Sequence, residues 1–179
     1  MKAAPRAARR PAHAAAAARP VQCAIVTVSD TRGARDDRSG DAIAARLERA
    51  GHAVAGRAWV RDEIAAIRRA VRAALARRST DAVIVTGGTG VAPRDVTPDA
   101  VEPLFDRTLP GFGEQFRALS AAQVGSAAWL SRASAGIARG RLVALLPGST
   151  RAVTLALDEL LIPELGHVAR LLGRLEPGD

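Results

Sequence analysis

The stretch VIVTGGTGVAPRDVTPD, which runs from residue 83 to residue 99, constrains the fold more than any other part of the sequence. It begins inside the run 81–86 (DAVIVT), whose apolar, β-branched composition is expected of a strand covered on both faces. The run ends abruptly in GGTG, where glycines let the backbone turn sharply and bring N–H groups close to an anion. The pattern therefore predicts a central strand whose carboxyl end carries a glycine turn.

Further apolar runs alternate with stretches of helical periodicity. After Asp62, for example, apolar residues recur at steps of three and four, which is typical of an amphipathic helix. Strands that alternate with helices imply parallel strands and right-handed crossovers. We therefore predict a three-layer α/β/α sandwich with a mostly parallel central sheet. The expected strands span 23–28, 53–60, 81–86 and 142–146, and the expected helices span 39–50, 113–123 and 151–161, with two more beginning near 62 and 97.

Two local signals indicate where helices begin and end. Thr97 followed by Pro98 predicts a helix that starts with a threonine cap and a proline in its first position. Pro163 predicts a break after the helix at 151–161, with a short terminal helix behind it, because proline removes a helical hydrogen bond.

The net charge of +8 is unevenly distributed. Residues 1–20 contain five basic side chains, no acidic one and many alanines and prolines, which predicts a disordered leader. The other 21 of the 26 basic residues and all 18 acidic residues fall in 21–179, so the expected single domain has a net charge of only +3. Because aromatic residues for base stacking are scarce as well, we expect no nucleic-acid partner.

Simple counts argue against a membrane protein and a disulfide-bonded one. No apolar run approaches the ~20 residues that cross a bilayer, so we expect a soluble protein without a membrane partner. Cys23 is the single cysteine, which excludes an internal disulfide and a cysteine-based metal site. A reducing compartment, the cytoplasm, is therefore the expected location.

The glycine turn does not match the common nucleotide-binding motifs. A P-loop requires lysine after its last glycine, but Val91 follows Gly90 and residues 21–179 contain no lysine. A dinucleotide fingerprint counted from Gly88 and Gly90 places Pro93 where a third small residue belongs. A tight turn that needs glycine for backbone reasons alone remains an alternative to an anion site.

Three polar loops follow expected strands, so we expect them to meet at the carboxyl ends of the parallel strands. This is the end of such a sheet where ligands bind. The loops contain Ser29, Asp30, Thr31 and Arg32; Thr86, Gly87, Gly88, Thr89 and Gly90; and Pro147, Gly148 and Ser149. Beside the glycine turn, Asp95 either caps the following helix or binds Mg²⁺. Arg94 either faces solvent or neutralises phosphate.

An ordered set of motifs covers about residues 22–172, almost everything after the leader. Its members are TVSDTR at 27–32, SGDAIAARLERAGH at 39–52, TGGTG and RDVTPDA within 86–100, PGFGEQFR at 110–117, SRASAG at 131–136 and LPGS at 146–149. In this order the motifs resemble the MoaB/Mog family of molybdenum cofactor biosynthesis proteins, whose active members are molybdopterin adenylyltransferases. TVSDTR and LPGS look more like the MoaB branch than the Mog branch.

The resemblance implies that Mg-ATP and molybdopterin meet in one pocket. The terminal phosphate of the pterin attacks the α-phosphate of ATP, pyrophosphate leaves, and adenylyl-molybdopterin results. A protein that aligns two anionic reactants needs no nucleophilic side chain of its own. The alternative is a catalytically silent molybdopterin-binding or carrier protein of the same pathway. The resemblance also implies a homo-oligomer, either a trimer or a hexamer, and other molybdenum cofactor assembly proteins as partners.

The resemblance assigns Asp62 and Asp95 to catalysis and to Mg²⁺, although Asp62 alone indicates only a first-turn acid favoured by the helix dipole. Without the resemblance, the segment 131–132 indicates a polar loop, Glu114 a first-turn helix residue and Ser149 a helix cap. The residues assigned to substrate or nucleotide binding are Ser29, Asp30, Thr31, Arg32, Thr86, Gly87, Gly88, Thr89, Gly90, Arg94, Gly111, Gly113, Glu114, Ser131, Arg132, Pro147, Gly148 and Ser149.

Overall fold

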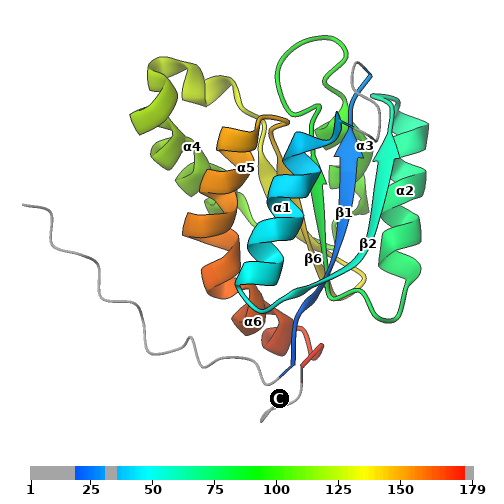
Figure 1. The fold of residues 1–179 in the computed structure, drawn as a ribbon. Helices are drawn as coiled ribbons and strands as arrows, with labels where there is room; N and C mark the ends of the chain where they lie inside the picture. The colour runs from blue at the N-terminus through cyan, green and yellow to red at the C-terminus, as the bar shows by residue number, and fades with distance from the viewer. Residues whose placement is uncertain (1–18, 31–35, 176–179) are drawn as a thin grey trace, which may run out of the picture.

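A six-stranded sheet with the order β2-β1-β3-β6-β5-β4 forms the centre of the protein (Figure 1). The computed structural model describes residues 19–30 and 36–175. The four strands β2, β1, β3 and β6 run parallel, while β5 is antiparallel to both β6 and β4. The strands are β1 (Gln22–Val28), β2 (Ala53–Val60), β3 (Ala82–Thr86), β4 (Arg107–Thr108), β5 (Ser134–Ala138) and β6 (Arg141–Leu146).

Helices cover both faces of this sheet, which confirms the predicted three-layer architecture (Figure 1). One face packs against α1 (Arg38–Arg49), α4 (Pro110–Val124), α5 (Thr150–Ala156) and α6 (Ile162–Leu171). The other face packs against α2 (Ile64–Ala76) and the short α3 (Thr97–Val101). Two 3₁₀ helices (Glu102–Leu104 and Gly125–Leu130) and a π-helical turn (Leu157–Leu161) complete the described elements.

The apolar runs of the central strands form the core on both sides of the sheet. Ile25 and Ile84 lie in the cluster beneath α1, α4, α5 and α6, whereas their neighbours Val26 and Val85 lie in the cluster beneath α2 and α3. All four side chains are at most 1% exposed. Burial on alternating sides explains why these strands are apolar at every position.

Two strands are missing from the sequence-based prediction. β4 has only two residues, and both are exposed. β5 has the sequence SAGIA, whose small residues give a weak strand signal. Gly136 in β5 allows close packing, since a Cβ there would lie 2.3 Å from a ring carbon of Phe105.

Three predicted helix boundaries are wrong, and one of them is the start of α4, which lies at Pro110, three residues before the predicted start. Thr97 lies inside α3 rather than at its cap, and its hydroxyl donates to the carbonyl of Gly87 at 2.8 Å. Pro163 does not end a helix, because α5, the π-helical turn and α6 follow one another without a gap. The wider turn just before Pro163 gives the proline ring room and tolerates its missing N–H.

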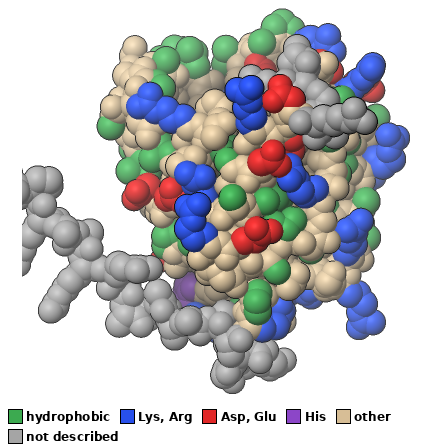
Figure 2. All heavy atoms as spheres, viewed as in Figure 1, with side chains coloured by type: hydrophobic (Ala, Val, Ile, Leu, Met, Phe, Trp, Pro, Cys, Tyr) green, Lys and Arg blue, Asp and Glu red, His purple; other side chains and the backbone are tan. Residues whose placement is uncertain are grey.

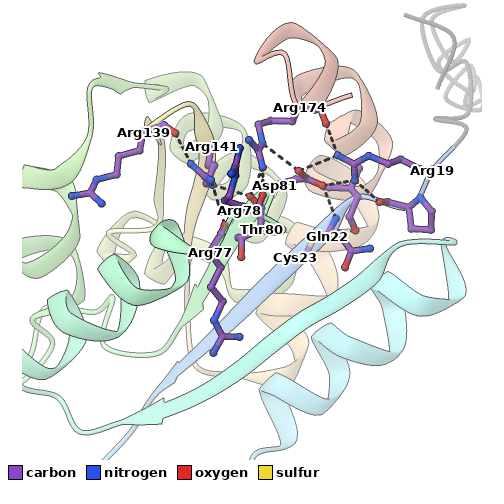
Figure 3. Close-up of polar contacts among 12 residues, drawn as sticks. Arg19, Gln22, Cys23, Arg77, Arg78, Thr80, Asp81, Arg139, Arg141 and Arg174 are labelled. Atoms are coloured by element: carbon purple, nitrogen blue, oxygen red, sulfur yellow. Dashed lines mark hydrogen bonds and ion pairs between the residues drawn. The ribbon is translucent and has the colours of Figure 1, made fainter. Parts of the chain in front are cut away.

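A buried carboxylate connects both ends of the described chain to the amino end of β3, the end opposite the glycine turn (Figure 3). The side chain of Asp81 is 1% exposed and accepts from Arg19 at 2.8 Å and from Arg174 at 3.2 Å. It also accepts from the backbone N–H of Gln22 at 3.0 Å. Arg19, which the charge pattern places in the leader, therefore contacts the folded domain, while residues 1–18 lie outside the described residues.

The surface on the α1 side carries basic and acidic side chains in alternation, without one continuous basic area on that face (Figure 2). Several of these charges form pairs, such as Arg57 with Asp41 at 2.6 Å and Arg46 with Asp158 at 3.3 Å. Among the described residues, no helix is both long enough and apolar enough to pass through a membrane.

Candidate functional site

The predicted meeting point of the three polar loops is a cleft of about 650 Å³, which we call the glycine cleft. It lies at the carboxyl ends of β1, β2, β3 and β6 and is bordered by the first residues of α1. Thr31 and Arg32 of the first loop lie outside the described residues. The predicted site residues that line the glycine cleft are Ser29, Asp30, Asp62, Gly87, Gly88, Arg94, Asp95, Gly148 and Ser149.

The glycine turn has a backbone conformation that other residues rarely adopt. Gly87 and Gly88 have φ values of 104° and 63°. Thr97 fixes the turn by donating its hydroxyl to the carbonyl of Gly87 and its N–H to the carbonyl of Gly88, at 2.8 and 3.0 Å. Within the described part of the chain, the N–H groups of Gly88, Thr89 and Gly90 donate to no acceptor. The turn therefore has three consecutive unpaired donors, and of their residues Gly88 lines the glycine cleft, whereas Thr89 and Gly90 do not.

The two aspartates assigned to catalysis pack directly against this turn. A Cβ on Gly88 would lie 2.5 Å from Oδ1 of Asp62, and a Cβ on Gly90 would lie 2.6 Å from Oδ2 of Asp95. Asp95 does not cap α3, because its Oδ2 instead accepts from the N–H of Ala92 at 2.9 Å. Glycine at both positions is what lets the two carboxylates come this close to the backbone.

The electrostatic environment of Asp62 is unfavourable for a negative charge. Burial, together with the charges of Asp30 and Asp95, raises the pKa of the Asp62 carboxyl, and Arg94 opposes this only in part. Oδ1 of Asp62 is buried and has no hydrogen-bond partner in the described structure. Arg94 forms an ion pair with Asp30 at 2.6 Å rather than with either catalytic candidate.

These features fit a divalent cation that arrives together with a phosphate ligand. No cluster of three or more His, Cys, Asp or Glu side chains in the described residues is arranged to hold a metal ion by itself. Mg²⁺ commonly binds through one or two carboxylates and completes its shell with water and substrate phosphates. The unpartnered oxygen of Asp62 and the neighbouring Asp95 match that requirement.

Asp37 organises the other wall of the glycine cleft, and sequence reasoning missed it. Its carboxylate caps α1 by accepting from the N–H of Gly40 at 2.8 Å, and it accepts from Thr27 and Arg57 at the same distance. Although burial opposes the charge, these bonds lower the pKa of Asp37. An acid just before a predicted helix is a cap signal that was available in the sequence.

A second cavity, of about 430 Å³, lies between α3, α4 and β5. Three of the predicted site residues, Gly113, Glu114 and Arg132, line this cavity and not the glycine cleft. Arg117 lines it too and was not predicted; its guanidinium donates to the carbonyls of Ser131 and Ala133 at 3.3 and 3.2 Å.

Arg132 connects the second cavity to the glycine turn. Its guanidinium donates to the carbonyl of Gly90 at 2.9 Å, to the carbonyl of Asp95 and to the carboxylate of Asp99 at 3.1 Å. Its backbone N–H donates to the carbonyl of Thr89 at 2.8 Å. The described contacts of Arg132 therefore hold the segment between Thr89 and Asp95 against the start of β5.

Three of the predicted site residues have side chains with structural contacts. Thr86 is buried and donates its hydroxyl to the carbonyl of Pro147 at 2.9 Å, and Ser149 caps α5 by accepting from the N–H of Ala152 at 3.2 Å. The hydroxyl of Ser131 accepts from the N–H of Ala133 at 3.3 Å. The predicted site residues absent from the described linings of both cavities are Thr86, Thr89, Gly90, Gly111, Ser131 and Pro147.

Comparison with known protein families matches residues 24–167 to the family described as a probable molybdopterin binding domain. The molybdenum cofactor biosynthesis protein B of Bacillus subtilis is 49% identical over 151 residues, which cover 84% of this chain and 89% of that protein. The chain belongs to the MoaB/Mog family. The resemblance seen in the motifs is thus confirmed.

Solved structures indicate the branch of the MoaB/Mog family. A crystal structure of a molybdenum cofactor biosynthesis protein B aligns with a TM-score of 0.85 at 43% identity and covers 89% of this chain and 99% of that one. The Mog protein of Mycobacterium ulcerans aligns with a TM-score of 0.75 at 28% identity and covers 86% of this chain and 97% of that one. The higher identity to the B protein confirms the expected position nearer the MoaB branch.

Proposed function

We propose that this MoaB/Mog-family protein acts in molybdenum cofactor biosynthesis and transfers adenylate from Mg-ATP to molybdopterin, with release of pyrophosphate. The observation that carries the proposal is the contact of two carboxylates, Asp62 and Asp95, with one glycine turn in one cleft. This arrangement combines N–H donors for a triphosphate with carboxylate ligands for the cation that accompanies it. The family match, to a probable molybdopterin binding domain, supports the pterin as the second reactant.

The charges of the glycine cleft support a nucleotide that binds as its magnesium complex. Its described lining contains five acidic residues (Asp30, Asp36, Asp37, Asp62 and Asp95) and two basic ones (Arg38 and Arg94). Free ATP carries several negative charges, and this lining would repel it. We therefore expect ATP to bind weakly when magnesium is removed with a chelator.

In the proposed reaction the protein positions both reactants and stabilises charge. The N–H group of Gly88, which lines the glycine cleft, is suited to donate to a phosphate oxygen of the nucleotide. Asp62 and Asp95 would hold Mg²⁺, which supplies charge neutralisation at the phosphates when it is bound. Arg94, whose side chain is 73% exposed, is free to exchange its contact with Asp30 for a phosphate.

A silent molybdopterin-binding or carrier role is the second candidate. The observation in its favour is that both arginines of the cleft already form ion pairs with acids, Arg94 with Asp30 and Arg38 with Asp36 at 3.1 Å. This leaves little free positive charge in the cleft for a triphosphate. A carrier would still use the same cavities to hold the pterin.

Incubation of the purified protein with molybdopterin and Mg-ATP separates the two candidates. We expect pyrophosphate and adenylyl-molybdopterin to appear in equal amounts, and neither to form when molybdopterin or magnesium is omitted. Tight binding of molybdopterin without any ATP-dependent product would instead identify a carrier.

A further inference from the structure

Trp59 is an aromatic side chain of the glycine cleft to which neither the motifs nor the proposed chemistry gives a role. It is the second-last residue of β2, is half-buried and lines the cleft. Its indole Nε1 is a buried donor that has no acceptor in the described structure. A buried donor without an acceptor is unfavourable, so the arrangement calls for an explanation.

The sheet register shows how Trp59 differs from its neighbours. One row across the parallel strands contains Trp59 of β2, Thr27 of β1 and Thr86 of β3. This row lies near the carboxyl ends of the strands, where the cleft begins. The hydroxyl of Thr27 donates to Asp37 and the hydroxyl of Thr86 donates to the carbonyl of Pro147. Trp59 is therefore the one donor of this row that the surrounding loops leave unpaired, within the described residues.

The position of Trp59 also sets its distance from the phosphate-binding turn. β1 lies between β2 and β3, and neighbouring strands are about 4.8 Å apart, so the end of β2 is roughly 10 Å from the end of β3. Nucleotides and pterin phosphates carry a fused heteroaromatic ring at about one sugar-sized spacer from the phosphate. A ligand with its phosphates on the glycine turn can thus place its ring near Trp59.

We propose that Trp59 is a substrate-contact residue of the glycine cleft: its side chain turns when a phosphate-bearing ligand binds, so that the indole N–H, which is buried in this structure, donates to a ring nitrogen of the ligand's fused heteroaromatic ring. The inference rests on the proposed function and extends it by naming the residue that recognises the ring. Purines and pterins share this chemistry, because both have fused rings with acceptor nitrogens. The two sources, ATP and molybdopterin, are distinguished by experiment.

The tryptophan content of the chain makes a direct test possible. The sequence contains two tryptophans and no tyrosine, and the second tryptophan, Trp129, is 73% exposed on the 3₁₀ helix Gly125–Leu130. In a Trp129→Phe variant the fluorescence therefore comes from Trp59 alone. This variant is titrated with Mg-ATP, with molybdopterin and with magnesium tripolyphosphate, which has the phosphates of ATP but no ring.

We expect the emission of Trp59 to change on addition of Mg-ATP or of molybdopterin, and to stay constant with tripolyphosphate. The ligand that produces the change identifies the ring that Trp59 contacts. The Trp59→Phe variant, whose emission comes from Trp129, is the control for loss of signal that arises only because the ligand absorbs light.

Because phenylalanine keeps the aromatic face but has no donor, Trp59→Phe is expected to weaken binding of that ligand by about 3- to 10-fold in calorimetry. Its affinity for tripolyphosphate should match the wild type.

The outcomes separate this inference from the proposed function. If wild type binds Mg-ATP and molybdopterin in calorimetry but Trp59 emission and the affinity of Trp59→Phe do not change, the role of Trp59 is wrong and the proposed function stands. An equal response to tripolyphosphate also overturns it, because the contact would then not involve a ring. If neither ring-bearing ligand binds the wild type, both proposals fail together.

Discussion

Asp62 occupies a position where a negative charge is unfavourable, and that position has a consequence for stability. Its pKa is raised by burial and by the neighbouring charges of Asp30 and Asp95. A carboxyl whose pKa is higher in the folded than in the unfolded state stabilises the fold below its ordinary pKa, and this contribution is lost as the pH rises through the raised value. At neutral pH, the charged Asp62 therefore opposes folding.

We expect Asp62→Asn to raise the free energy of unfolding at neutral pH, by less than about 1 kcal/mol because water screens a partly exposed carboxylate. The gain should shrink as the pH falls toward the ordinary range of aspartate. Urea unfolding at several pH values measures it. Asp36→Asn is the control, since Asp36 lines the same cleft but is paired with Arg38. A variant that is less stable than wild type at every pH would contradict this account of Asp62.

Gly88 provides a second test at the residue scale, because the chain contains a matched control. Gly88 and Gly140 have nearly the same φ, 63° and 67°, but a Cβ on Gly140 would meet nothing within 4 Å. Gly140→Ala is thus expected to cost only the backbone strain of about 1–2 kcal/mol. Gly88→Ala also pushes against Asp62 and Thr97, which should cost about 1–3 kcal/mol more. Equal losses in urea unfolding would show that the close packing around Gly88 is unimportant.

Single elements differ in how far the sequence reveals them. β1, β3 and β6 are continuous apolar or β-branched runs, and these three strands and the more weakly patterned β2 were predicted within a residue or so. β5 was missed because its small residues serve packing against Phe105 rather than strand propensity. The helix through Pro163 was misjudged because a π-helical turn, which has no clear sequence signal, accommodates the proline.

The candidate site follows the same pattern. The sequence could place Asp95 near the carboxyl ends of the strands, since it follows the glycine turn. Asp62 was assigned to the same site through the family resemblance, because its position alone indicated only a first-turn helix acid. It could not show that Arg132 reaches back 42 residues to Gly90, because such a contact depends on tertiary packing of distant segments. Trp59 was overlooked because β2 is a weakly patterned strand at the edge of the sheet.

Arg132 forms contacts between separate elements, and we expect the loss of these contacts to loosen the glycine turn. Arg132→Met removes the donors to the carbonyls of Gly90 and Asp95 and the ion pair with Asp99. The free energy of unfolding should fall by about 1–3 kcal/mol, since polar groups lose their partners. Arg94→Met, at a side chain that is 73% exposed, is the control and should change it by less than about 0.5 kcal/mol. If urea unfolding gave similarly small decreases in the free energy of unfolding for both variants, Arg132 would not hold the glycine turn in place.

At the scale of the whole molecule, the two ends of the sheet have different roles. The carboxyl end holds the glycine cleft, where charges of one sign are crowded together. The opposite end holds the Asp81 cluster, where Arg19 and Arg174 bring the two ends of the described chain to one buried carboxylate (Figure 3). This separation places the unfavourable charges of the proposed site far from the contacts that join the ends of the described chain.

We expect Asp81→Ala to destabilise the protein by about 2–3 kcal/mol, because it removes a buried carboxylate that accepts hydrogen bonds from two partly exposed arginines and one backbone N–H. Asp158→Ala removes an ion pair with Arg46 whose carboxylate is 48% exposed, and should cost less than about 1 kcal/mol. Thermal unfolding of the two variants under one condition compares them. A loss at Asp81 no larger than that at Asp158 would mean that the buried cluster does not secure the chain ends.

The measurement that tests the central claim most directly is pyrophosphate release by Asp95→Asn with molybdopterin and Mg-ATP. Asparagine keeps an oxygen that can accept from the N–H of Ala92, so the turn should fold normally, but the negative charge beside it is lost. We predict a rate at least about 100-fold below wild type with an unchanged unfolding curve, while Asp158→Asn keeps the wild-type rate. A folded Asp95→Asn variant that releases pyrophosphate as fast as wild type would contradict the account.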